Sequence, residues 1–137
     1  IEDADGATAE RCAAFADSRI DLRVRDHRLG WVGNSNATLG EAVLSGVEYV
    51  AILPHDDLLL PDYCARLVSE IERNPGTALA FSDIQNFGMN TNIMSRKDVL
   101  GSRIERFEQL FRGPMKAIPY RGLMPRDIAA KALPLPS

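Results

Sequence analysis

Acidic side chains occur at places where strands are expected to end. They are Asp3, Asp5, Asp56, Asp57 and Asp83. Ligand sites in open α/β sheets lie outside the carboxyl ends of the strands. Carboxylates gathered at one edge repel each other, and a bound cation relieves that repulsion; all-oxygen ligands suit Mg²⁺ or Mn²⁺. The sequence therefore predicts a divalent-cation site at this edge, although each aspartate taken alone is more often a turn or helix N-cap residue.

Strands and helices alternate along the first part of the chain. Residues 47–53 form a nearly continuous apolar, β-favouring run, which is typical of a strand covered on both faces in a parallel sheet. Residues 20–24 alternate apolar and polar like a strand with one buried face, and residues 78–81 are a further short strand. Helices are expected at residues 8–16, 36–44, 61–73, 100–111 and 126–133. Residues 85–95 are predicted to be a loop and residues 118–124 a short strand plus turn. This alternation predicts an α/β fold with a mostly parallel sheet flanked by helices.

Length and charge exclude several classes of protein. The chain has 137 residues, 45% hydrophobic and 26% charged, which fits one globular domain. It carries 16 Lys+Arg against 19 Asp+Glu, a formal charge of -3, and the basic residues are scattered. Because phosphodiester backbones require a basic stripe, no nucleic-acid partner is expected. No run approaches the about 20 consecutive apolar residues of a transmembrane segment.

The cysteines and histidines argue against a Cys/His metal centre. Cys12 and Cys64 are the only cysteines, and both fall at apolar positions of expected helices, so buried thiols are predicted. The two histidines lie far from either cysteine in sequence, which nearly rules out a cluster of these ligands. Thiols outside a disulfide framework are typical of a reducing compartment, and the predicted location is cytoplasmic.

Five short segments occur in a definite order. They are Ile1-Glu-Asp-Ala-Asp-Gly-Ala-Thr8, Leu29-Gly-Trp-Val-Gly-Asn-Ser-Asn36, Val47 to Asp57 with Pro61, Asn74-Pro75 and Phe81-Ser-Asp83. In this order and spacing the chain resembles a family 2 glycosyltransferase of the GT-A fold over residues 1–85. The resemblance implies a GT-A-like (Rossmann-like), mostly parallel sheet flanked by helices, with residues 1–137 forming a single domain.

The same resemblance implies how that domain is divided. Residues 1–84 would form the half that binds the nucleotide sugar, and residues 85–137 would form part of the acceptor side. Because the chain opens at Ile1 and runs at once into an acidic strand-to-loop pattern, it is expected to be a fragment of a longer protein.

The donor-binding residues that the resemblance implies come from two loops. Asp3 or Asp5 would contact the base and ribose of the nucleotide-diphosphate sugar. Gly30, Asn34 and Asn36 belong to a loop-to-helix element whose glycine allows close backbone approach and whose helix N-terminus would face the diphosphate. Family members often have an arginine where this chain has Ser35. Trp31, in the same segment, is expected to be a buried anchor, with a stacking surface as the other interpretation.

The segment Ile52-Leu-Pro-His-Asp-Asp57 occupies the place of the family's Asp-x-Asp metal motif. Aligned this way, Asp56 is the implied ligand of Mg²⁺ or Mn²⁺, and Asp57 would orient that ligand or the donor sugar. His55 is a second candidate ligand, although a lone loop histidine is more often a surface residue. Pro54 stands where the first aspartate of the motif often stands.

The resemblance implies metal-assisted transfer of a sugar to a saccharide or other hydroxyl acceptor, with inversion at the anomeric carbon. No residue matches the family's catalytic base. Pro54, Ser35 and the missing base favour the alternative, a catalytically inactive GT-A-like domain with a nucleotide-binding or scaffold role. A third interpretation is a response-regulator-like module, which would require a lysine on a later strand, and none is evident.

Overall fold

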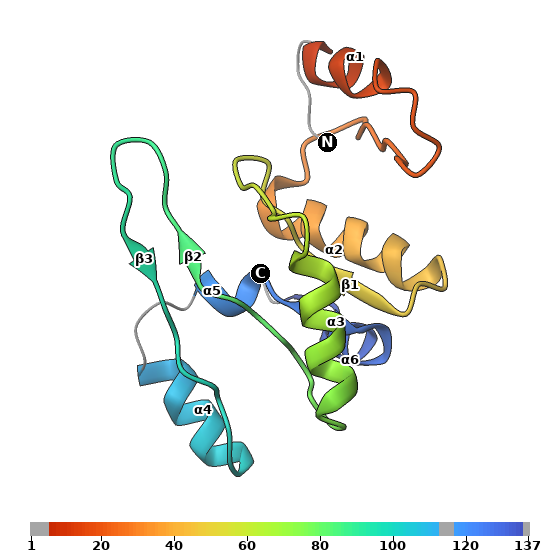
Figure 1. The fold of residues 1–137 in the computed structure, drawn as a ribbon. Coiled ribbons are helices and arrows are strands. Elements are labelled where there is room, and N and C mark those ends of the chain that lie inside the picture. Colours follow the sequence, from red (N-terminus) through yellow and green to blue (C-terminus); the bar gives the residue numbers. More distant parts are fainter. Residues whose placement is uncertain (1–5, 113–116, 136–137) are drawn as a thin grey trace.

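The structure, a computed structural model, describes residues 6–112 and 117–135 (Figure 1). Its elements are, in chain order, α1 (Ala7–Ala13), α2 (Gly30–Leu44), β1 (Tyr49–Ala51), α3 (Tyr63–Arg73), β2 (Ile84–Gln85), β3 (Ile93–Met94), α4 (Arg103–Arg112), α5 (Ala117–Tyr120), β4 (Leu123–Pro125) and α6 (Arg126–Ala132).

The expected GT-A-like (Rossmann-like), mostly parallel sheet is wrong for the described residues. They form two short antiparallel sheets of two strands each, β1 with β4 and β2 with β3. In the first sheet Tyr49 lies opposite Pro125 and Ala51 opposite Leu123. The prediction failed because β4, which comes from the far end of the chain, lies where a parallel neighbour of β1 was expected.

β4 has a second neighbour along its other edge. The N–H and C=O of Leu123 both bond to the backbone of Ala80, at 2.8 and 2.9 Å, in an isolated antiparallel bridge. This bridge is all the pairing that the predicted strand 78–81 makes among the described residues. β4 therefore separates β1 from the 78–81 segment, and both of these run antiparallel to it.

Residues 20–24 do not form the predicted strand. Ile20 and Val24 are about half exposed, and the Arg23 guanidinium pairs with the Asp21 carboxylate two residues away. Alternating polarity suits a half-buried strand, but a strand also needs a neighbour to accept its backbone hydrogen bonds. No strand pairs with this segment in the described part of the chain.

Two small apolar clusters hold the centre of the molecule. One lies between α3 and β4 and contains Leu67, Ile71, Ala80 and Leu123, with Tyr49, Tyr63 and Val68 packed around it. The other lies among α2, β1 and α6 and contains Leu39, Val50 and Ala129. The helix expected at residues 61–73 is confirmed as α3, and Leu67 and Ile71, four residues apart, lie on its buried side.

The remaining elements lie outside these clusters. Figure 1 shows α1 and α4 apart from the central helices, and neither has a buried residue. The predicted loop 85–95 includes the end of β2 and all of β3, and α2 begins at Gly30, six residues before the expected helix. Cys64 is exposed and Cys12 half-buried, so the expected buried thiols are also wrong. Among the described helices, none combines the length and the apolar character needed to cross a membrane.

Candidate functional site

A tight turn after β1 presents the predicted metal motif. The Asp57 N–H donates to the Pro54 carbonyl at 3.1 Å, which closes the turn over residues 54–57. His55 and Asp56 occupy its tip and are exposed, whereas Asp57 is half-buried. The turn therefore points one carboxylate into solvent and the next toward the body of the protein.

Asp57 is held by an ion pair with Arg121, the last residue before Gly122 and β4. The Arg121 Nε donates to one carboxylate oxygen, and Nη2 lies 3.4 Å from the other. Both side chains are about three-quarters buried, at 23% exposure for Asp57 and 28% for Arg121. The hydrogen bond to Asp57 raises the pKa of the Arg121 guanidinium, and the Asp56 charge adds to that effect, while burial opposes it. The pair joins the acidic turn to the start of β4.

Tyr63, the first residue of α3, also contacts Arg121. Its hydroxyl donates to the Arg121 carbonyl oxygen. Burial raises the pKa of this phenol above its ordinary value, since the charged form would lose solvation. Arg121 had no predicted role in the site, because it lies 64 residues from Asp57 and no local spacing signals the contact.

Asp56 and His55 make no hydrogen bond or ion pair among the residues that the structure describes. No three His, Cys, Asp or Glu side chains in the described ranges come close enough together to share a metal ion, so the expected gathering of Asp56, Asp57 and Asp83 is not observed there. Mg²⁺ usually takes only one or two protein carboxylates and completes its shell with water and substrate phosphates. The Asp56 carboxylate fits that smaller role.

The predicted donor residues of α2 have other partners. Gly30 is its first residue and has a positive φ of 68°, which suits glycine. The Asn34 side-chain oxygen lies 3.4 Å from the Arg25 Nε. Asn36 donates to the Leu135 carbonyl at 3.2 Å and accepts from the Leu135 N–H at 2.6 Å. Its amide therefore clamps the C-terminal segment onto α2.

The other acidic candidates do not join this site in the described part of the chain. Asp3 and Asp5 lie outside the described residues. Asp83 is exposed, immediately before β2. Their predicted roles in contacting the nucleotide or a cation stay predictions.

Trp31 is 64% exposed, so the expected buried anchor is wrong. Its ring centroid lies 5.4 Å from that of Tyr120, with the planes tilted by 42°. Tyr120 is half-buried and directly precedes Arg121. The aromatic pair is therefore next to the ion pair that holds the acidic turn.

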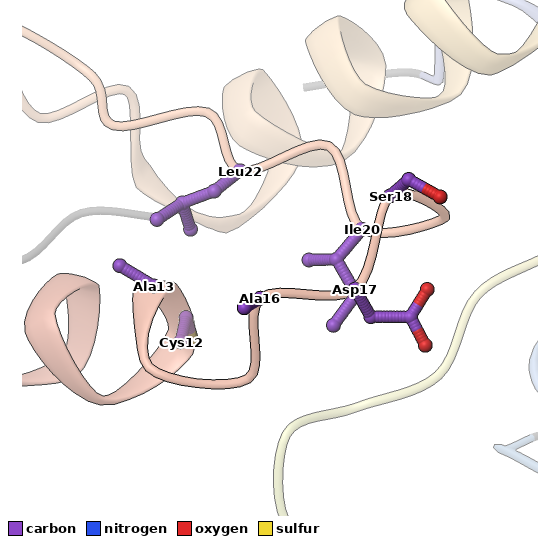
Figure 2. Close-up of a pocket in the computed structure, with 7 residues that line it drawn as sticks. All are labelled: Cys12, Ala13, Ala16, Asp17, Ser18, Ile20 and Leu22. Atoms are coloured by element: carbon purple, nitrogen blue, oxygen red, sulfur yellow. The ribbon is translucent and has the colours of Figure 1, made fainter.

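The described residues also line hollows away from the turn. A small apolar cavity of about 90 Å³ lies under Tyr120 and is lined by Leu39, Ile52, Pro119, Tyr120, Met124, Ala129, Ala132, Leu133 and Leu135. A wider, open pocket of about 340 Å³ is formed by α1 and the segment after it, between Cys12 and Leu22. Figure 2 shows apolar side chains facing one another across it, with the Asp17 carboxylate pointing away. That carboxylate binds Arg19, which lowers its pKa. The wider pocket uses no residue of the acidic turn.

No family model matches this chain, and no match is found among curated proteins or among solved structures.

Proposed function

We propose that this chain takes part in transferring a sugar from a nucleotide-diphosphate sugar to the hydroxyl of a saccharide or other acceptor, with the donor bound at the turn 54–57. One observation carries the proposal: Asp56 is exposed and lacks a partner in the described structure, while its neighbour Asp57 is held by Arg121. A carboxylate without a hydrogen-bond partner, on a turn that is held in place, is suited to binding a cation that the phosphates of a substrate also bind.

In this proposal each residue of the turn has a separate task. Asp56 holds Mg²⁺ or Mn²⁺, and His55 is a second candidate ligand at the same tip. The cation, when bound, stabilises negative charge that develops on the leaving diphosphate. Asp57 keeps the turn in place through Arg121 and lies close enough to the tip to orient the donor sugar.

Other parts of the proposal depend on the sequence resemblance alone. Gly30, Asn34 and Asn36 are proposed donor contacts, as are Asp3 and Asp5. Inversion at the anomeric carbon is proposed without an assigned base. A cytoplasmic location is proposed as well, and the unpaired thiols of Cys12 and Cys64 support a reducing compartment.

A second candidate is a domain that binds a nucleotide or acts as a scaffold without catalysing transfer. Two contacts favour this candidate, because they engage side chains that a donor would need. The Asn36 amide is hydrogen-bonded to Leu135, and the Asp57 carboxylate is paired with Arg121. Pro54, where family members often have an aspartate, points the same way.

Calorimetric titration with UDP, GDP and dTDP, each with and without Mn²⁺, tests the donor site. We expect one nucleotide to bind in a Mn²⁺-dependent manner and Asp56→Asn to weaken that binding at least about tenfold, because a ligand to the cation loses its charge. Glu72→Gln is the matched control. Glu72 is an exposed carboxylate near the far end of α3, about 14 Å along the helix axis from Tyr63.

The outcomes separate the candidates. Mn²⁺-dependent binding that Asp56→Asn weakens and Glu72→Gln leaves unchanged supports the donor site. Release of nucleotide from a bound nucleotide sugar in the presence of acceptor then supports transfer, and binding without release supports the non-catalytic candidate. If no nucleotide binds, or if Asp56→Asn binds as well as the wild type, the proposal is rejected.

A further inference from the structure

The three residues after α6 form a short strap that returns to α2. They are Leu133, Pro134 and Leu135, and they belong to neither a helix nor a strand. Leu133 leaves the helix in an extended conformation, with φ -85° and ψ 147°. The ring of a proline disfavours helical backbone at the residue before it, so Pro134 accounts for this change of direction. The strap then reaches α2, where Leu135 meets Asn36.

The strap has an apolar seat on the body of the protein. Leu133 and Leu135 are half-buried and pack against the cluster that α2, β1 and α6 share, and both line the small cavity of about 90 Å³. Pro134, between them, is exposed. The strap therefore covers apolar side chains with its two leucines while its middle residue faces solvent.

The polar hold on the strap comes from one side chain. The Asn36 Nδ2 donates to the Leu135 carbonyl at 3.2 Å, and the Asn36 Oδ1 accepts from the Leu135 N–H at 2.6 Å. Among the described residues, every hydrogen bond of Leu135 goes to this amide. Pro134 has no N–H to donate. The end of the strap can therefore lift without breaking a backbone hydrogen bond of the central sheet or helices.

The strap also adjoins the proposed donor site. Leu135 lines the same small cavity as Tyr120 and Ile52. Tyr120 directly precedes Arg121, whose guanidinium binds Asp57, and Ile52 lies two residues before the acidic turn begins. A strap that opens would uncover this side of the turn and free the Asn36 amide in the same movement.

We propose that the strap is an autoinhibitory latch: when closed it holds Asn36, and a nucleotide-diphosphate donor must displace it to use that amide. This inference rests on the proposed function, because Asn36 is one of the donor contacts proposed there. The Asn36 amide is fixed at both its oxygen and its nitrogen, so turning it toward a ligand breaks its bonds to Leu135. Strap and donor are alternative partners of one side chain.

Loosening the strap should therefore tighten donor binding. When a site is available only part of the time, the apparent affinity falls by the fraction of molecules in which it is open. Leu135→Ala keeps the backbone groups that Asn36 binds and removes most of the side chain that lines the cavity. We expect this variant to bind the nucleotide with Mn²⁺ about fivefold more tightly in calorimetric titration.

Leu44→Ala is the matched control. It is the same substitution at the last residue of α2, where the leucine is 87% exposed and lies outside the strap and its seat. We expect its nucleotide affinity to equal that of the wild type. Equal affinities in Leu135→Ala and the wild type, or weaker binding in Leu135→Ala, would overturn the latch.

A second background separates a latch from a leucine that only supports the fold. In Asn36→Ala the polar hold is already gone, so adding Leu135→Ala should bring no further tightening. Two residues that act through one contact are not additive in this way. If Leu135→Ala tightens binding equally with and without Asn36, the strap does not act through this amide and the inference is rejected.

Hydrogen exchange at the strap gives a direct readout in the wild type, measured by NMR of the isotopically labelled chain. We expect the nucleotide with Mg²⁺ to speed exchange of the Leu135 amide. The Arg126 amide is the control, since it donates to the Glu48 carbonyl at 2.9 Å at the start of α6 and should be unchanged. Exchange at Leu135 that is unchanged or slower with nucleotide bound would contradict displacement of the strap.

The latch and the donor site fail in different ways. Mn²⁺-dependent nucleotide binding that Leu135→Ala does not tighten rejects the latch and leaves the donor site standing. If neither the wild type nor Leu135→Ala binds any of the nucleotides, the donor site is rejected, and the latch is rejected with it.

Discussion

The ion pair between Asp57 and Arg121 connects the predicted metal-binding turn to the strand β4. Asp57 was expected to bind the donor, and in the structure its carboxylate is engaged by a guanidinium that comes from the other end of the chain. An ion pair of this kind, three-quarters buried and hydrogen-bonded, contributes more than a surface pair, since solvent screens it less. Its first consequence is structural: it holds the acidic turn to β4.

Replacing Asp57 is therefore expected to destabilise the fold. Asp57→Asn removes the carboxylate charge that faces the Arg121 guanidinium, and we expect a loss of about 1–3 kcal/mol in the free energy of unfolding. Asp62→Asn is the matched control, because Asp62 pairs with Arg66 in an exposed i, i+4 pair; a change within about 0.5 kcal/mol is expected there. Urea denaturation measures both. Equal losses in the two variants would contradict a structural role for the Asp57 pair.

Single residues were predictable where their role is local. The turn at His55 and Asp56 follows from an apolar run that ends in polar residues, and its exposure agrees with that pattern. Arg121 could not be predicted, because a pair 64 residues apart depends on how the strands assemble. The exposure of Trp31 was predicted wrongly for a related reason. A hydrophobic side chain favours burial, but whether another surface packs over it depends on the whole fold.

At the scale of elements, the 78–81 segment passes close to the entry to β4 at Gly122. A side chain added at Gly122 would place its Cβ 2.6 Å from the Ala80 carbonyl oxygen and 2.7 Å from a Leu79 methyl. A real Cβ does not approach backbone so closely, so the bridge between these segments requires glycine.

Gly122→Ala is accordingly expected to lower the unfolding free energy by about 1–3 kcal/mol, because the bridge at Ala80 must shift. Gly40→Ala, in the middle of α2, is the control: nothing lies within 4 Å of its added Cβ, and alanine favours helix, so a gain of up to about 1 kcal/mol is expected. Thermal unfolding by circular dichroism compares the two. A neutral Gly122→Ala would mean that the two segments do not approach this closely in solution.

Helices were more predictable than strands. A helix satisfies its own backbone, so the spacing of Leu67 and Ile71 was enough to place α3. A strand is defined by its neighbour, and β1 found an antiparallel partner in β4 where sequence analysis expected parallel ones. Residues 20–24 have strand-like alternation, but no strand of the described structure pairs with them, and they remain irregular.

At the scale of the whole molecule, the packed centre and the outlying helices differ in how they are held. α2, α3, α5, α6, the β1–β4 sheet and the 78–81 segment contribute the buried apolar residues, while α1 and α4 contribute none. On α4 the rings of Phe107 and Phe111 stack on each other at 5.5 Å and stay exposed. Isolated helices shorter than about 12–15 residues are marginally stable in water. Because α1 and α4 bury no residue, packing against the rest of the described structure adds little to their stability.

Hydrogen exchange should reproduce this difference. Amides of α3 and of the β1–β4 sheet are expected to exchange slowest, near the rate set by global unfolding, and those of α1 and α4 fastest, through local opening. Peptide-resolved mass spectrometry measures this. Protection of α4 equal to that of α3 would contradict the arrangement and would indicate that the apolar side of α4 is covered in solution.

The position of β4 also bears on how the protein can form as it is synthesised. β1 ends at Ala51, but the strand that pairs with it begins at Leu123. Chains grow at about 5–20 residues per second, so β1 waits several seconds on the ribosome for its partner. Throughout that time α2 and α3 have no completed sheet to cover. The central sheet therefore forms late, only after β4 has been synthesised. The segments that precede β4 cannot fold completely one after another as they leave the ribosome.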